Sequence, residues 1–134
     1  MAESTGAMVL LIDDDPFMLK ITGKQLEHWG YRVMTAADGE SGVNVAKDKH
    51  PDVILLDFNM PVMTGPEALQ ALKRDPDMAD IPVIMLTGKE SEHDRDMVLG
   101  LGAFAHVSKP YRPEELSQQV EAAVQEHRSK HAPS

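Results

Sequence analysis

The amino-acid sequence predicts an α/β fold in which helices cover both faces of a parallel sheet. Short apolar runs of strand character alternate five times with segments of helical character, a pattern typical of strands joined by crossover helices. Val53 to Leu56 is apolar at every position, as expected of a strand that is buried on both faces. The expected strands are 9–12, 31–35, 53–56, 81–86 and 104–107.

The first two helices are indicated by residues that favour helix ends. Pro16 suits the first turn of a helix, Met18 and Leu26 stand at helical spacing, and Gly30 suits the end. After the second strand, Asp38 is a suitable N-cap because its side chain can accept a hydrogen bond from the first turn.

The last three helices follow the third, fourth and fifth strands. Thr64 and Glu67 have the spacing of a capping box. Ser91 with Asp94 predicts the start of a short acidic helix, and Pro113 predicts the start of the last one.

Length and composition limit the kind of protein this can be. The 134 residues are enough for one core and one domain, and we expect a flexible tail over 1–7, the domain over 8–128 and a polar tail over 129–134. A net charge of -9 disfavours a surface for nucleic acid or anionic membrane, so partners should be proteins or small cations. The chain has no cysteine and no signal-peptide pattern at its start, which favours the cytoplasm.

Residues suited to phosphoryl chemistry stand at the ends of four of the five strands. They are Asp13 and Asp14, Asp57, Thr87 and Lys109. Because the carboxyl ends of parallel strands meet at one edge of a sheet, these groups are expected to share one pocket. The three carboxylates would repel one another unless a cation lies among them, and Mg²⁺ prefers such oxygen ligands.

The same residues suggest a reaction. A carboxylate at the open end of the pocket could attack phosphorus and form an acyl phosphate, and from the residues alone any of the three could be the nucleophile. Lys109 and Thr87 would then bind phosphoryl oxygens. Gly88, directly after Thr87, leaves room for the group and a backbone N–H near it.

With their neighbours, these residues closely resemble the receiver domain of two-component response regulators. The similarity extends from about Met8 to Arg128. It rests on Leu-Ile-Asp13-Asp14-Asp15-Pro16, Val-Ile-Leu-Leu-Asp57-Phe-Asn-Met-Pro61 with Gly65, Met-Leu-Thr87-Gly88, Gly102-Ala103 and Ser-Lys109-Pro110. The resemblance implies a flavodoxin-like, doubly wound five-stranded parallel sheet with five helices. Its strand order, 2-1-3-4-5, is known from chemotaxis receivers and is carried over from the family.

The resemblance also implies a role for each acidic residue. Asp57 would be the phosphoacceptor, taking a phosphoryl group from the phosphohistidine of a sensor histidine kinase or a phosphotransfer protein. Asp13 and Asp14 would hold Mg²⁺ together with Asp57 and the backbone carbonyl of Asn59. Mn²⁺ could substitute for Mg²⁺.

The remaining pocket residues would act on the phosphoryl group. In the family, Lys109 would pair with the new phosphate, and Thr87 would swing inward to hydrogen-bond it as part of the switch. The backbone at Gly88 and Asn59 would also contact the group. The peptide bond between Lys109 and Pro110 is expected to be cis.

Two positions depart from the common family pattern. His106 stands where receivers usually have Tyr or Phe, so the switch is expected to be modified, and it could respond to pH. Lys89 stands where an acidic or polar residue is frequent. Together with Asn59 it would flank the path of the hydrolytic water and tune the lifetime of the acyl phosphate.

We therefore expect a stand-alone, cytoplasmic receiver similar to chemotaxis or phosphorelay regulators. It would be a phosphoacceptor signalling domain that supports only its own phosphoryl transfer and autodephosphorylation. Its output would be binding to a downstream protein, without direct contact to nucleic acid and without membrane insertion. A phosphorylation-dependent homodimer is left open, as is a receiver fragment of a larger regulator or hybrid kinase.

The main alternative is a phosphatase of the haloacid dehalogenase type. Asp13-x-Asp15, Thr87 and Lys109 also fit that series, with Asp13 as the nucleophile, but no acidic strand-end pair follows Lys109 and Asp57 would have no role. A third class, a receiver-like module that only binds partners, would be expected to lack one of the essential groups. The identity of the nucleophile separates the first two classes.

Overall fold

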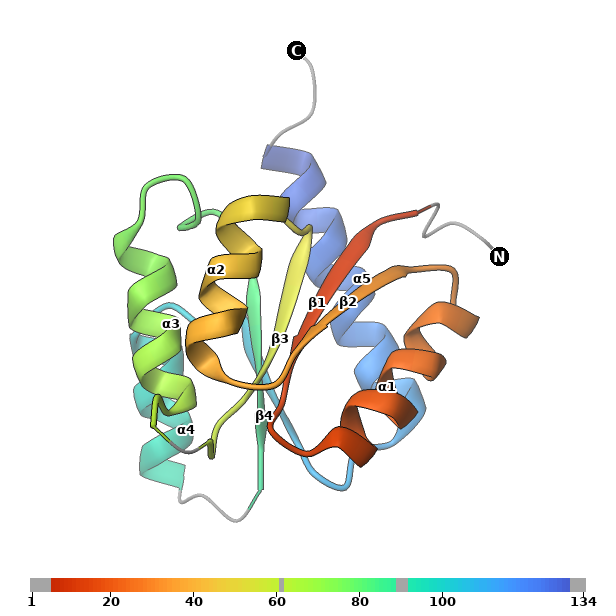
Figure 1. The fold of residues 1–134 in the computed structure, drawn as a ribbon, viewed down its shortest axis with the longest axis horizontal. Coiled ribbons are helices and arrows are strands. Elements are labelled where there is room, and N and C mark those ends of the chain that lie inside the picture. The colour runs from red at the N-terminus through yellow and green to blue at the C-terminus, as the bar shows by residue number, and fades with distance from the viewer. Residues whose placement is uncertain (1–5, 61, 89–91, 131–134) are drawn as a thin grey trace.

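The computed structural model describes residues 6–60, 62–88 and 92–130 of the chain. Within these ranges five strands alternate with five helices, as the sequence predicts. The elements are β1 (Met8–Ile12), α1 (Pro16–His28), β2 (Arg32–Ala36), α2 (Gly39–Lys49), β3 (Val53–Asp57), α3 (Gly65–Arg74), β4 (Val83–Thr87), α4 (Glu92–Gly100), β5 (Ala105–Ser108) and α5 (Pro113–Lys130). Figure 1 shows the strands as one central layer between two groups of helices.

The five strands form one parallel sheet in the order β2-β1-β3-β4-β5. This confirms the flavodoxin-like topology. The chain winds outward from β1 in both directions, first to β2 and then to β3 on the other side. The carboxyl ends of β1 and β3 therefore flank the topological switch point, where open α/β sheets form their binding crevice.

The strands are apolar throughout because their side chains alternate between two cores. Leu10 and Ile54 belong to the core under α2, α3 and α4, whereas Val9 and Leu55 belong to the core under α1 and α5. Figure 1 shows this division, with α1 and α5 on one side of the sheet and the other three helices on the opposite side. Burial on both faces removes the polar alternation of a half-exposed strand.

Several strand bounds differ from the expected ones by one or two residues. The structure has Arg32–Ala36 in place of 31–35, and Ala105–Ser108 in place of 104–107. β4 starts at Val83 and not at Ile81, because the N–H of Ile81 donates to Met78 in a turn and Pro82 has no N–H. At their other ends β3 and β4 continue one residue further than expected, through Asp57 and Thr87.

The predicted helix starts are confirmed where the structure describes them. Pro16 is the first residue of α1, and Asp38 is the N-cap of α2. Thr64 and Glu67 form both hydrogen bonds of the capping box at the start of α3. Pro113 opens α5.

Ordered structure extends past the expected limits of the domain at both ends. Ala7 is fully buried, and its carbonyl accepts a hydrogen bond from Arg32, although it was expected in the tail. At the other end α5 continues through Lys130. Ser91, expected to start the fourth helix, lies outside the described residues. In the described part of the chain, no helix has the length and apolar character needed to cross a bilayer.

Candidate functional site

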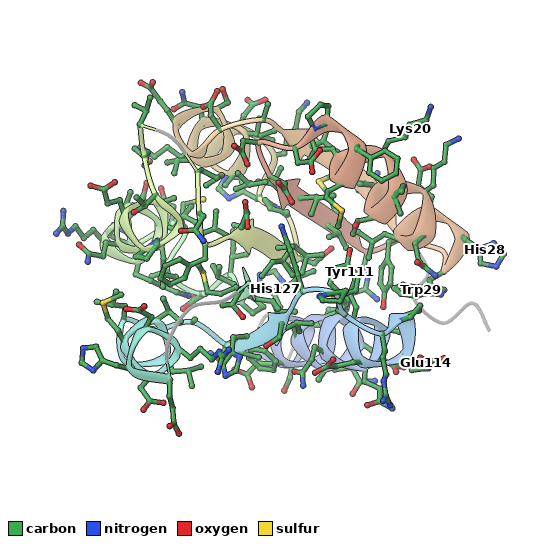
Figure 2. All side chains as sticks on the ribbon, turned by 90° about the horizontal axis from the view of Figure 1, so that it is seen from below. Lys20, His28, Trp29, Tyr111, Glu114 and His127 are labelled. Carbon is green, nitrogen blue, oxygen red and sulfur yellow. The ribbon has the colours of Figure 1, made fainter. Side chains whose placement is uncertain are left out.

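The register of the strands places the predicted site residues at one edge of the sheet. The last residue of β1 pairs with the next-to-last residue of β3, so Asp13 follows β1 at the level of Asp57. Thr87 lies one residue beyond that level on β4, and Lys109 directly follows β5, whose last residue pairs with Thr87. The strands run downward to this edge in Figure 1, and Figure 2 is seen from below.

Lys109 joins two of the three carboxylates. Its Nζ lies 3.1 Å from Oδ2 of Asp13 and 3.1 Å from Oδ1 of Asp57. Asp13 has a relative exposure of only 1% and Asp57 of 8%. Both ion pairs are thus largely withdrawn from water, where the attraction between opposite charges is stronger than at an exposed surface.

The electrostatics of the pocket shift the pKa of both partners. Burial raises the pKa of Asp57 to about 6, the carboxylate of Asp13 adds to the rise, and the Lys109 ammonium opposes it without cancelling it. Burial lowers the pKa of Lys109, but the carboxylates of Asp57 and Asp13 outweigh this effect, so its pKa is raised. At neutral pH the lysine is therefore charged and Asp57 is mostly ionised.

Asp14 brings a third carboxylate to the same place. One oxygen from each of Asp13, Asp14 and Asp57 lies within 4.8 Å of the others, and Asp14 is the exposed member of the group. Three carboxylates with a single lysine leave an excess of negative charge. A hard divalent cation such as Mg²⁺ would relieve this repulsion, and it prefers oxygen donors of this type.

Helix capping accounts for only one residue of the acidic run. Oδ1 of Asp15 accepts a hydrogen bond of 2.9 Å from the N–H of Phe17, which makes Asp15 the N-cap of α1. Asp13 is instead a hydrogen-bond acceptor in the pocket. Its Oδ1 accepts a hydrogen bond of 3.0 Å from the N–H of Asp15, and its Oδ2 accepts one from Nζ of Lys109. Asp13 and Asp14 thus belong to the pocket.

The other predicted residues lie at or just after the ends of β3, β4 and β5, at the same edge of the sheet. Thr87 is fully buried, with its hydroxyl 3.5 Å from the carbonyl of Val107, and its own carbonyl accepts 2.6 Å from the N–H of Lys109. The expected cis peptide at Lys109-Pro110 is present. Asn59 is exposed in the loop after β3, and Gly88 directly follows β4.

Of the two residues that depart from the family pattern, the structure describes only His106. His106 is half-buried in β5, opposite Met85 of β4. Its Nδ1 is buried and has no hydrogen-bond partner within the described ranges. Lys89 lies outside the described residues, so its expected role stays a prediction.

One polar contact beside the pocket was not foreseen from the sequence. The hydroxyl of Tyr111, two residues after Lys109, is hydrogen-bonded to Oγ1 of Thr22 on α1. The two residues are 89 positions apart. No spacing rule links such residues, and the only available signal was the closeness of Tyr111 to Lys109 in the chain.

Comparison with known proteins agrees with this geometry. Residues 9–121 match the response regulator receiver domain family. The chain is 38% identical over 120 residues to the probable transcriptional regulator ycf27 of Guillardia theta, covering 90% of this chain and 46% of that protein. It is 35% identical over 119 residues to the phosphate regulon transcriptional regulatory protein PhoB of Pseudomonas aeruginosa, covering 89% of this chain and 52% of that protein.

Solved structures show the same fold. The chemotaxis protein CheY4 of Vibrio cholerae matches with a TM-score of 0.83 and 34% identity, over 88% of this chain and 98% of that chain. The receiver domain of the sensor histidine kinase PA1611 of Pseudomonas aeruginosa matches with a TM-score of 0.83 and 29% identity, over 90% and 98%. That structure contains a magnesium ion coordinated in its active site cleft.

The chain belongs to the response regulator receiver domain family. It is a receiver domain of two-component systems, which is a signalling domain and not an enzyme in the usual sense. The chain spans about half the length of the curated relatives it matches.

Proposed function

We propose that Asp57 accepts a phosphoryl group from the phosphohistidine of a sensor histidine kinase or phosphotransfer protein, and that this step switches binding to a protein partner. The observation that carries the proposal is the position of the Lys109 ammonium, 3.1 Å from carboxylate oxygens of both Asp13 and Asp57 at the switch point of the sheet. A lysine at this place can stabilise the charge that develops on a phosphoryl group bound at Asp57.

The hydrogen bonds of the pocket favour Asp57 over Asp13 as the nucleophile. Both carboxylate oxygens of Asp13 are engaged, one by the N–H of Asp15 and one by Lys109. Of Asp57, only Oδ1 is engaged by a described residue. An oxygen that accepts no hydrogen bond keeps more of its basicity for attack on phosphorus, whereas donors already stabilise the charge on both oxygens of Asp13. This argues against the phosphatase alternative, in which Asp13 would attack.

The transfer itself needs little from the protein beyond positioning and charge. An oxygen of Asp57 forms a bond to phosphorus while the bond between phosphorus and the imidazole nitrogen of the donor breaks. Lys109 then pairs with a phosphoryl oxygen and the hydroxyl of Thr87 turns toward another. The backbone at Gly88 and Asn59 contacts the group, and slow hydrolysis restores the carboxylate.

The acidic cluster fits a magnesium ion. Asp13, Asp14 and Asp57 would hold it with the backbone carbonyl of Asn59, and the hard oxygen donors would also accept Mn²⁺. When bound, the ion would offset the charge of the carboxylates and of the incoming phosphoryl group.

The same proposal covers partners and location. A net charge of -9 supports a protein target over direct contact with nucleic acid, although several relatives carry the name of transcriptional regulators. We place the domain in the cytoplasm, where kinase and target would meet it. A second copy of the domain, bound on phosphorylation, is the other protein partner that we include.

The decisive experiment is the intact mass of the protein after incubation with acetyl phosphate and Mg²⁺. The parent should gain one phosphoryl group, and Asp57→Asn should gain none because the nucleophile is gone. Asp13→Asn should still be labelled, at a rate lower by about tenfold or more, since it keeps the nucleophile but loses a metal ligand. Labelling that persists in Asp57→Asn and is lost in Asp13→Asn would move the nucleophile to Asp13 and favour a phosphatase.

A second prediction concerns the modified switch at His106. His106→Tyr should change the affinity of the phosphorylated domain for its partner by about fivefold, within the coupling of 1–3 kcal/mol that is typical between two sites. The change in the amide NMR resonances of β5 and α5 on addition of acetyl phosphate gives an independent measure. His93→Tyr, at an exposed position of α4, is the control and should have no effect. Equal responses of parent and His106→Tyr would remove His106 from the switch.

A further inference from the structure

The Thr22–Tyr111 hydrogen bond connects α1 to the loop that carries Lys109. Tyr111 lies two residues after Lys109, and its hydroxyl bonds to Oγ1 of Thr22, which is only 2% exposed. The ring of Tyr111 is half-buried and packs on the core under α1 and α5 together with Trp29. Figure 2 shows Tyr111 between the ribbons of α1 and α5, while Lys20 and His28 project outward from α1.

With this bond, the backbone around Lys109 is held at two places, at Lys109 itself and at Tyr111. The N–H of Lys109 itself donates a hydrogen bond of 2.6 Å to the carbonyl of Thr87, which ties the backbone to β4. After it in the chain, Tyr111 is fastened to α1 through Thr22. The ammonium therefore starts from a backbone segment that is held by the sheet at one end and by a helix at the other.

Helix α1 also contacts the pocket directly. Its N-cap, Asp15, donates its N–H to Oδ1 of Asp13, the carboxylate that shares Lys109 with Asp57. Thus α1 orients Asp13 at its first turn and holds the lysine loop at Thr22, almost two turns later. The same helix therefore contacts Asp13 and the segment that carries the lysine paired with it.

We propose that Thr22 and Tyr111 act as a clasp that positions the Lys109 ammonium between Asp13 and Asp57 and so sets the rate of phosphoryl transfer to Asp57. The inference deepens the proposed function and rests on it. Tyr111 and Thr22 are positioning residues that act through Lys109. Lysine has four rotatable side-chain bonds, and a misplacement of about 1 Å at a reacting group can cost about a hundredfold in rate.

The simpler reading is that the two hydroxyls only satisfy each other, as buried polar groups must. Both readings predict some loss of stability when the bond is removed. They differ in what happens to folded protein, because only the clasp predicts that Lys109 moves and that phosphorylation slows under conditions where every variant is folded.

The test compares Tyr111→Phe, Thr22→Val and Thr22→Ser with the parent, in 15N-labelled protein below its unfolding range. Phe and Val remove one hydroxyl each with little change of shape, whereas Ser keeps the hydroxyl of Thr22. Labelling of Asp57 by acetyl phosphate should be about fivefold slower in the first two variants and close to the parent in Thr22→Ser. The Mg²⁺ concentration for half-maximal labelling should stay within about twofold, since Lys109 is not a ligand of the ion.

A double variant tests whether the two residues act as one unit. Tyr111→Phe with Thr22→Val should label no more slowly than either single variant, since each already breaks the same bond. Losses that multiply would show two independent effects and overturn the clasp. Parent-like labelling in both single variants would overturn it as well and leave a purely structural hydrogen bond.

The 15N resonance of the Lys109 ammonium separates this inference from the proposed function. Held by two carboxylates, it should give a resolved, slowly exchanging signal in the parent and in Thr22→Ser, and a shifted or broadened one in Tyr111→Phe and Thr22→Val. If this pattern appears but the parent is not labelled, the clasp stands and phosphotransfer fails. If the signal is the same in all four proteins, the clasp is wrong whatever the labelling shows.

Discussion

In buffer without divalent cations, Asp57→Asn should be more stable than the parent by about 3 kcal/mol at pH 8, and this gain should vanish near pH 4. The folded protein raises the pKa of Asp57 from the ordinary value of 3.8 to about 6, first through burial and then through the carboxylate of Asp13. This rise of about two pKa units corresponds to roughly 3 kcal/mol in the free energy of unfolding, at about 1.4 kcal/mol for each unit.

The sign follows from proton binding. Because the folded state holds the proton of Asp57 more tightly than the unfolded chain does, raising the pH from 4 to 6 destabilises the parent. Above about pH 6 the carboxylate is charged in both the folded and the unfolded state, and the parent is destabilised to the full extent. Below about pH 4 it is neutral in both states, and Asn, which has nearly the same shape, gains nothing.

Urea unfolding at pH 4, 5, 6 and 8 measures this effect. Asp14→Asn is the control, because Asp14 belongs to the same cluster but is exposed, and its gain should stay below about 1 kcal/mol. Magnesium should raise the melting temperature of the parent more than that of Asp57→Asn, since the ion binds the folded state through the lost carboxylate. A gain in stability that is the same at every pH would mean that folding does not raise the pKa of Asp57.

Much of the fold and of the candidate site could be predicted from the sequence because the signals were local. A strand buried on both faces is recognised by an unbroken apolar run such as Val53 to Leu56, and the residue after the run marks the edge of the sheet. Four such strand ends, followed by Asp13, Asp57, Thr87 and Lys109, were enough to predict the pocket, since parallel strands bring their carboxyl ends together.

The features that escaped prediction depend on contacts between distant parts of the chain. The bond from Tyr111 to Thr22 follows no spacing, because it depends on how α1 and the last loop pack on the same core. The burial of Ala7 has a similar cause: its carbonyl accepts from Arg32 at the start of β2, which continues the sheet by one residue. The start of β4 depended on a turn at Ile81 that an apolar run does not reveal.

Gly65 shows how closely the backbone around Asp57 is packed. It is the first residue of α3, and its N–H donates 2.9 Å to the carbonyl of Phe58. A Cβ added here would lie 2.3 Å from the carbonyl oxygen of Asp57 and 2.8 Å from Cα of Phe58. Both neighbours are backbone atoms, so they cannot turn away as the end of a side chain would. Only glycine allows α3 to start this close to the end of β3.

Gly65→Ala should therefore destabilise the protein by about 3 kcal/mol and slow the labelling of Asp57 by acetyl phosphate about tenfold or more. The first effect is the cost of forcing a methyl group into a closed contact, at the upper end of what overpacking causes. The second follows because relief of the clash must move the backbone of Asp57 or of α3, and the nucleophile loses its alignment with Lys109. Urea unfolding and intact-mass kinetics measure the two effects.

Gly100→Ala is the matched control, because it adds the same methyl group to a glycine at the end of α4 that has no atom within 4 Å of the added Cβ. It should stabilise the protein by about 0.5 kcal/mol through the better helix propensity of alanine and leave labelling unchanged. If Gly65→Ala were as stable as the parent, the loop after β3 would be able to yield, and the position of Asp57 would not depend on this contact. If it were unstable but labelled at the parent rate, the backbone of α3 and not that of Asp57 would be the part that moves.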